Sequence, residues 1–379
     1  MKHTTRVILV GMLALLLTPL SIFAQDDLQE ETLLMTFIPN IQFAPTYVAI
    51  GEGYFEEAGF DVSVEYLDEP NVVDLVAAEE NSFGIVSGEQ VILAAAQGRP
   101  IVYVYEWFQQ FPIGIVYPSD MNVESIDDLT DSRIGIPGRF GATYSGFTTL
   151  LDSAGIDESD ISLEEIGFAA PEVFCVGAVD ASVIYVNNEP LQIQNRANSD
   201  DCGDVTDVSV LAIGDIIDLV SNGIITNQTL VEENPEQVSA FIAAYNSGLQ
   251  LAINNPAQAY LTSAPFIEGL PLDDDFRAVL ETLAEEQDTF LADEPTREAI
   301  AENRLAQYET LAEQFDAQTL LQYEILLASI ELWDADQLGF TDADSWANMR
   351  DTLINLGQIE DGAVDVDTLY SNGFLPQGE

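Results

Sequence analysis

The chain has 379 residues, and 47% of them are hydrophobic, which is enough for two domains with sizeable cores. Ten basic residues stand against 66 acidic ones, and the resulting net charge of −56 argues against partners such as nucleic acid or anionic membrane surfaces. The single lysine and the single histidine are Lys2 and His3, so the rest of the chain can form no Ser-His-Asp triad, no Schiff base and no histidine-based zinc site.

The N-terminus has the pattern of a signal peptide. Lys2 and Arg6 precede an almost wholly apolar run, Val7–Leu20, and Ala24 is a small residue at the expected cleavage point. We therefore expect residues 1–24 to be removed on export, which leaves a net charge of 8 − 66 = −58. An uncleaved anchor is the alternative. No later stretch is apolar for long enough to cross a membrane.

Residues 33–66 predict a strand, a helix and a second strand. The apolar run 33–38 ends at Pro39, residues 44–51 have helical spacing, and residues 60–66 alternate between apolar and polar side chains. In open α/β sheets ligands bind at the carboxyl ends of the strands, which here is the loop 39–45.

Strands and helices then alternate as far as residue 227. This rhythm predicts α/β architecture, with sheets flanked by helices. We interpret 113–118 and roughly 219–227 as two crossings between lobes, so that residues 25–115 with 222–379 form lobe I and residues 116–221 form lobe II. Residues 234–356 are predicted to be helical and form part of lobe I. Further strands are expected at 83–86, 101–105, 133–136 and 223–227.

Two motifs carry a family resemblance. Residues 40–47 read Asn-x-Gln-Phe-Ala-Pro-x-Tyr, and residues 53–62 read Gly-Tyr-Phe-Glu-Glu-Ala-Gly-Phe-Asp-Val. This order resembles the opening of periplasmic-type solute-binding proteins of ABC importers, in the branch that binds the pyrimidine precursor of thiamine, riboflavin or sulfonates. The resemblance implies a two-lobed, type II clamshell in which each lobe is a mixed sheet flanked by helices. It also implies a monomer that works with an ABC permease and ATPase, without a cofactor or metal.

Candidate ligand contacts lie on loops at the ends of predicted strands, where two lobes can close on a ligand. The first three sets are Asn40, Gln42, Phe43 and Tyr47; Ser87 and Glu89; and Trp107 and Gln109. The fourth set is Gly138, Arg139, Phe140, Gly141, Thr143 and Tyr144, and a fifth, expected on the cleft floor, is Tyr185, Asn188 and Glu189.

The chemistry of these residues suits a flat, polar ligand, because aromatic rings stack on heteroaromatic rings and amides recognise their edges. The loop 138–144 receives most weight, since its glycines allow close approach and Arg139 can stack or neutralise an anion. The first two sets have structural alternatives. Phe43 and Tyr47 can be core residues, Asn40 and Gln42 can cap a helix, and Ser87 with Glu89 can do the same.

Cys175 and Cys202 are the only cysteines. An exported protein meets an oxidising compartment, where the two thiols can form a disulfide. Two buried free thiols are the alternative, because the sequence does not give the distance between them.

The family resemblance implies that the chain binds a small heteroaromatic, vitamin-type molecule and delivers it to the permease. A thiamine pyrimidine precursor is the first candidate and riboflavin the second. A sulfonate comes third, because Arg139 is the only well-placed cation. The pyrimidine-synthase relatives carry a cysteine-rich motif and a reactive histidine, which this chain lacks, so we expect no enzyme. A secreted enzyme that uses paired carboxylates on a sugar or a metal is the rival class.

Overall fold

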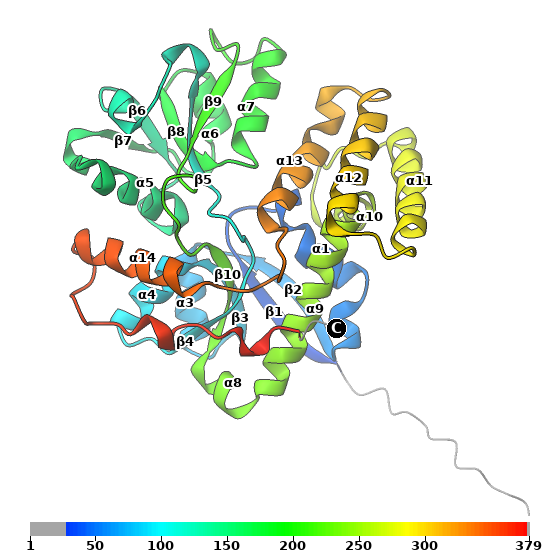
Figure 1. Cartoon of the computed structure of the whole chain (residues 1–379), viewed down its shortest axis with the longest axis horizontal. Coiled ribbons are helices and arrows are strands. Elements are labelled where there is room, and N and C mark those ends of the chain that lie inside the picture. The colour runs from blue at the N-terminus through cyan, green and yellow to red at the C-terminus, as the bar shows by residue number, and fades with distance from the viewer. Residues whose placement is uncertain (1–27, 377–379) are drawn as a thin grey trace, which may run out of the picture.

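The computed structural model describes residues 28–376, so the expected signal peptide lies outside the described residues. Two five-stranded sheets form the centre of the molecule (Figure 1). The first has the order β2-β1-β3-β10-β4, and only β10 runs antiparallel to its neighbours. Its strands are β1 (Gln29–Met35), β2 (Phe60–Tyr66), β3 (Phe83–Ser87), β4 (Ile101–Glu106) and β10 (Asn222–Asn227).

Strand β1 shows why the first sheet is buried on both faces. Leu33 and Met35 belong to one hydrophobic cluster, whereas Leu34, on the opposite face, belongs to another. Helices α1, α2 and α9 cover the first face, where Phe241 of α9 stacks on Phe83 with ring centroids 3.8 Å apart. Helices α3 and α4 cover the second face. The helices are α1 (Ala44–Gly51), α2 (Tyr54–Glu57), α3 (Glu69–Ala77), α4 (Gly88–Ala96), α8 (Gln228–Glu233) and α9 (Pro235–Asn254).

The second sheet has the order β7-β6-β8-β5-β9. Its parallel core is β7, β6 and β8, and β5 joins antiparallel to β8. Helix α5 packs on one face, and helices α6 and α7 pack on the other. The elements are β5 (Ile113–Pro118), β6 (Arg133–Ile136), α5 (Gly141–Ala154), β7 (Ser162–Glu165), α6 (Ala170–Cys175), β8 (Ala181–Tyr185), α7 (Glu189–Asn198) and β9 (Val208–Ala212).

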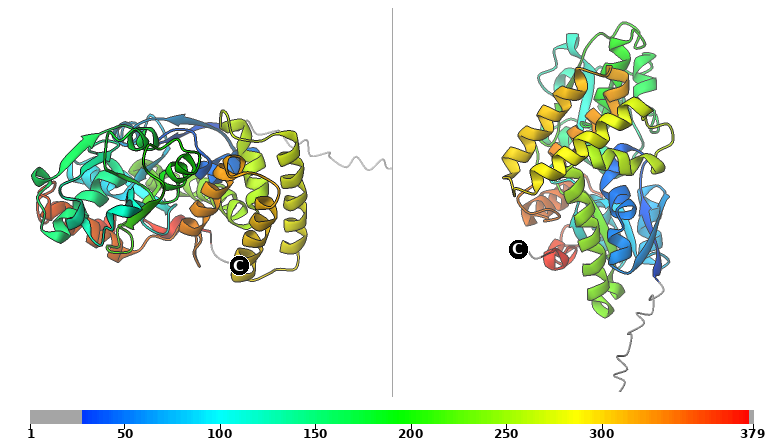
Figure 2. Two further views of the ribbon diagram at one scale, coloured as in Figure 1. Left: turned by 90° about the horizontal axis from the view of Figure 1, so that it is seen from above. Right: turned by 90° about the vertical axis from the view of Figure 1, so that its right-hand side faces the viewer.

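The C-terminal part is helical, as the sequence predicts. Helices α10 to α13 lie side by side at one end of the molecule, and α14 packs on α4 and α5 (Figure 1, Figure 2). Within residues 28–376, no helix combines the length and apolar character that a membrane span requires. The helices are α10 (Pro256–Ser263), α11 (Asp274–Leu291), α12 (Arg297–Ala312), α13 (Ala317–Trp333) and α14 (Ala343–Asn355).

The crossings between the sheets differ from the predicted segments. Residues 113–118 form β5, a buried strand between β8 and β9, and residues 222–227 form β10 inside the first sheet. The chain crosses in the irregular segments just before them, 107–112 and 213–221. Apolar runs of this kind are buried on both faces of a sheet and cannot serve as exposed connections. The boundary expected at 115/116 therefore falls inside β5. We use lobe I for the first sheet with its helices and α8–α14, and lobe II for the second sheet with α5–α7.

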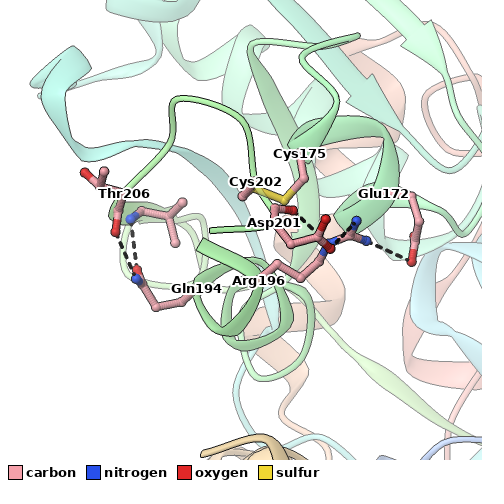
Figure 3. The surroundings of a disulfide bond; sticks show 8 residues. Glu172, Cys175, Gln194, Arg196, Asp201, Cys202 and Thr206 are labelled. Atoms are coloured by element: carbon pink, nitrogen blue, oxygen red, sulfur yellow. Dashed lines mark hydrogen bonds and ion pairs between the residues drawn. A yellow bond between two sulfur atoms is a disulfide. The ribbon is translucent and has the colours of Figure 1, made fainter. Parts of the chain in front are cut away.

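Cys175 and Cys202 are joined by a disulfide in lobe II (Figure 3). The bond links the end of α6 to the loop between α7 and β9, inside a small apolar cluster that includes Phe174 and Ile193. Beside it, Arg196 of α7 lies within 3.0 Å of a carboxylate oxygen of Asp201. The disulfide therefore fastens the outer helical layer of lobe II.

Removing this disulfide should destabilise the protein. The bond closes a loop with a sequence separation of 27, and replacing both cysteines by alanine should lower the free energy of unfolding by about 3 kcal/mol, because the unfolded chain gains entropy. Thermal or urea unfolding measures the change. A reducing agent should lower the unfolding midpoint of the wild-type protein and leave that of the double variant unchanged. Equal midpoints for the oxidised and reduced wild type would contradict the assignment.

Candidate functional site

A cavity of about 60 Å³ lies where the carboxyl ends of the parallel strands in the two sheets face each other. Lobe I contributes the loops that follow β1, β2 and β4, and lobe II those that follow β6, β7 and β8. This is the place where open α/β sheets hold ligands. Seven aromatic side chains line the cavity: Phe37, Phe43, Trp107, Phe108, Phe140, Phe168 and Tyr185.

The aromatic side chains form a continuous wall across both lobes. The ring centroids of Phe43 and Trp107 lie 5.4 Å apart, and those of Trp107 and Phe108 lie 4.6 Å apart. Phe108 then reaches Tyr185 of lobe II at 6.1 Å. Rings at these separations offer flat apolar faces to a planar ligand.

Two polar atoms beside these rings have no hydrogen-bond partner among residues 28–376. The side-chain oxygen Oε1 of Gln42 and the indole nitrogen Nε1 of Trp107 are both buried without a hydrogen bond. Both residues line the cavity. A buried polar group without a partner costs free energy, so such atoms at a cavity are natural contacts for a ligand. Gln42 offers an acceptor and Trp107 a donor.

A pair of buried carboxyl groups lies where the lobes meet. Ser87 Oγ is 2.5 Å from Oε2 of Glu69 and 2.5 Å from Oε1 of Glu89. A hydroxyl has only one proton to donate, so the second short contact requires a proton on a carboxyl group. Burial raises the pKa of Glu69, and the nearby Glu89 raises it further; burial also raises the pKa of Glu89. The two carboxyl groups therefore favour the protonated form more than exposed carboxyl groups do.

Glu69 also faces the other lobe. Helix α5 begins at Gly141, whose φ is 71°, and a Cβ atom there would lie 3.1 Å from Oε1 of Glu69. Only glycine permits both this backbone conformation and this close approach. The lobes thus touch through a carboxyl group and the start of a helix.

Tyr185 and Glu189 form the floor on the lobe II side. An oxygen of Glu189 accepts a hydrogen bond of 3.0 Å from the backbone N–H of Tyr185. Burial raises the pKa of Glu189 to about 7. The hydroxyl of Tyr185 donates to Oδ1 of Asn222 in lobe I, at 3.0 Å. A second bond between the lobes joins Asn187 Nδ2 to Ser329 Oγ at 2.7 Å. These two bonds join lobe I to lobe II.

The structure brings eight of the candidate ligand contacts to the cavity. They come from both lobes and from four of the five predicted sets. They are Gln42, Phe43, Trp107, Phe140, Gly141, Thr143, Tyr185 and Glu189.

Other candidates lie outside the cavity lining and have structural partners. The side chain of Asn40 caps the short 3-10 helix that follows it, by accepting from the N–H of Gln42. The ring of Tyr47 stacks on Phe266, and its hydroxyl bonds to Tyr66. Gln109 donates to backbone oxygens of residues 106 and 340. The side-chain oxygen of Asn188 accepts from Gln192, and the hydroxyl of Ser87 contacts the carboxyl groups of both Glu69 and Glu89.

Arg139, the expected cation of the site, is not among the residues that line the cavity. Its guanidinium pairs with Glu158 and Glu165 on the surface of lobe II. The hydroxyl of Tyr144 donates to the same Glu158 at 2.7 Å. Gly138 is also outside the lining, and a Cβ there would collide with the ring of Phe140. The cavity lining therefore contains carboxyl groups, at Asp68, Glu69 and Glu189, but no arginine.

Sequence reasoning missed several lining residues, among them Phe37, Glu69, Phe168 and Asn222. Phe37 and Glu69 follow strands β1 and β2, so their position at strand carboxyl ends was a usable signal. Phe168 follows β7, a short strand with polar residues that is hard to recognise from the sequence. Asn222 opens β10, and only the sheet order places it at the cleft.

Comparisons with known proteins agree with this geometry. The family described as "NMT1/THI5 like" matches residues 40–259. A riboflavin-binding protein, RibY, of Chloroflexus aurantiacus is 31% identical over 94% of this chain and 88% of its own. A formylaminopyrimidine-binding protein of Halalkalibacterium halodurans is 26% identical over 62% of this chain and 71% of its own. A protein of Legionella pneumophila named 4-amino-5-hydroxymethyl-2-methylpyrimidine phosphate synthase is 23% identical over 60% of this chain and 71% of its own.

Solved structures support the same fold. A protein of Bordetella bronchiseptica has a TM-score of 0.65 at 15% identity, covering 92% of this chain and 96% of that one. A periplasmic sulfonate-binding protein of a putative sulfonate ABC transporter from Methylobacillus flagellatus has a TM-score of 0.55 at 14% identity, covering 92% and 93%. The predicted two-lobed architecture of mixed sheets flanked by helices is thus confirmed.

The buried carboxyl groups predict a pH-dependent stability. Burial raises the pKa values of Glu106 and Glu189 from 4.5 to about 7, and that of Glu69 also rises. The folded protein then binds more protons than the unfolded chain above about pH 4.5, so the free energy of unfolding should fall as the pH rises from there through about 7. Glu69→Gln removes one such group. As the pH rises from 5 to 8, the thermal unfolding midpoint of this variant should therefore fall less than that of the wild-type protein.

The control is Glu313→Gln, which changes an exposed side chain and should leave the pH profile as in the wild type. If Glu69→Gln also leaves the profile unchanged, the carboxyl group of Glu69 does not carry the extra proton.

Proposed function

The chain belongs to the NMT1/THI5-like family, and we propose that it is the solute-binding subunit of an ABC importer that closes its two lobes around riboflavin. One observation carries this proposal: a cavity between the lobes with seven aromatic side chains, several hydrogen-bond acceptors and no arginine in its lining. The relative that covers 94% of this chain at 31% identity is named a riboflavin-binding protein.

The lining suits an uncharged flavin. The three fused rings of riboflavin present large flat faces for stacking against aromatic side chains. Their edge carries an N–H group and carbonyl oxygens, which match the free acceptor of Gln42 and the free donor of Trp107. The hydroxyl groups of the sugar-like chain can donate to carboxyl groups such as Glu69 and Glu189.

The size of the cavity requires movement. A volume of about 60 Å³ holds only a few water molecules, so a flavin can enter only when the lobes move apart. We propose that the segments 107–112 and 213–221 act as hinges between lobe I and lobe II. The hydrogen bonds Tyr185–Asn222 and Asn187–Ser329 would then break on opening and form again on closing.

A thiamine pyrimidine precursor is the second candidate, although the motifs alone placed it first. The formylaminopyrimidine-binding relative supports it, and an amino group on the ring could donate to Glu189. A single pyrimidine ring would contact fewer of the seven aromatic side chains than a flavin does. A sulfonate is disfavoured, because Arg139 pairs with Glu158, and an anion in the cavity would face the carboxyl groups of Asp68, Glu69 and Glu189 with no arginine among the lining residues.

We propose binding without catalysis, although some relatives bear the name of a synthase. The proposed partners are an ABC permease and its ATPase, and the proposed state is a monomer. The disulfide between Cys175 and Cys202 supports a location outside the cytoplasm, where such bonds persist.

A titration with riboflavin tests the function directly. We expect the purified protein to bind one riboflavin per chain and to release it unchanged on unfolding. Isothermal titration calorimetry gives the stoichiometry, and chromatography of the released compound shows whether it was converted. Binding of a formylaminopyrimidine without riboflavin would favour the second candidate, and turnover of either compound would contradict a pure binding role.

Substituting Gln42 tests the predicted ligand contact. Gln42→Met keeps the shape of the side chain and removes the amide, so riboflavin affinity should fall about tenfold, the equivalent of one lost hydrogen bond. The matched control is Gln318→Met, because Gln318 is exposed near the start of α13 and lies outside the cavity lining and both proposed hinges. Equal affinities for the Gln42 variant and the wild type would remove Gln42 from the site.

A further inference from the structure

Two phenylalanine rings from different lobes meet at the cavity. Phe37 follows β1 in lobe I, and Phe168 lies in the loop between β7 and α6 in lobe II. Their ring centroids are 4.9 Å apart and their planes are inclined by 83°, an edge-to-face contact. Both side chains line the cavity. A single contact between the lobes therefore also forms part of the cavity wall.

Core packing does not explain this pair. Phe168 is 42% exposed and Phe37 is half-buried, whereas most aromatic side chains of the described chain are buried. Large apolar side chains that stay exposed at a concave site commonly take part in recognition. The pair thus lies at the rim of the cavity, with one side toward solvent and the other toward the space inside.

The backbone at Phe37 supports a functional role. Its φ is 71°, in the left-handed region that residues with a bulky side chain rarely adopt. Glycine would take this conformation without strain. Strained residues of this kind persist where the surrounding structure fixes them, and they cluster at binding sites. The surrounding structure therefore holds Phe37 in place despite its unfavourable backbone conformation.

We propose that Phe37 and Phe168 are specificity-determining residues that grip opposite faces of the ligand's ring system. This inference rests on the proposed flavin-binding function. In this structure the two rings contact each other edge to face. When the lobes part and close again on a flat ring, the two side chains separate to about 7 Å, two van der Waals thicknesses, and each covers one face. Contacts from both lobes would favour a planar guest over one of another shape.

The test uses Phe37→Leu and Phe168→Leu, which keep an apolar side chain at each position and remove the aromatic face. Each should raise the dissociation constant of riboflavin about fivefold. Lumichrome keeps the fused rings and lacks the sugar-like chain, and its dissociation constant should rise by the same factor in each leucine variant. Phe37→Tyr and Phe168→Tyr should retain wild-type affinity, because tyrosine has the same ring face. The control is Phe340→Leu, since Phe340 is 41% exposed and outside the cavity lining.

We call the stacking of both rings on the bound ligand a grip, and a role in which the rings only obstruct the path into the cavity a door. Stopped-flow kinetics distinguishes the two. A grip predicts that the leucine variants release riboflavin about fivefold faster, with an unchanged association rate. A door predicts that association and dissociation accelerate together with no change in affinity, and this result would overturn the proposal. Unchanged affinity and rates in both leucine variants would also overturn it while leaving flavin binding intact. If the wild-type protein binds neither riboflavin nor lumichrome, the proposed function fails first and the grip fails with it.

Discussion

The arrangement of the two sheets is the constraint on which the rest of the structure depends. The parallel strands of both sheets point their carboxyl ends at one cleft, because the chain leaves the first sheet after β4 and returns to it at β10. Loops that follow these strands are freed from the sheet ladders and can carry side chains suited to a ligand. Every aromatic side chain of the cavity lies in such a loop or at the end of a strand. The fold therefore determines which loops line the cavity.

Charge shapes the site as much as geometry does. The chain carries a net charge of −56, and Arg139, in the loop after β6, pairs with Glu158 and Glu165. The carboxyl groups in and behind the cavity lining lack a cation there, so they share protons or accept hydrogen bonds. Such an environment repels anions and favours neutral guests with several hydrogen-bond donors. We therefore propose that desolvated acceptors and aromatic faces determine the specificity of the site.

The sequence predicts most elements because hydrophobic periodicity is a local property. The alternation at 60–66, the glycine-rich start of α5 and the helical C-terminal part all appear in the structure as expected. The site was only half predictable. Gln42, Trp107 and Glu189 sit next to recognisable strand or helix ends, whereas the fate of Arg139 depends on Glu158, and that of Tyr47 on Phe266. The positions of these two side chains depend on contacts with residues distant in the sequence, and a single sequence does not reveal such contacts.

Hydrogen–deuterium exchange with and without riboflavin tests the central claim, closure of two lobes on a flavin, most directly. If the protein closes on the ligand, exchange should slow at both rims of the cleft, in residues 36–43 and 107–112 of lobe I and in residues 137–143 and 167–170 of lobe II. The far helices α11 and α12 should be unaffected. Protection confined to one lobe, or no protection at saturating riboflavin, would contradict the account.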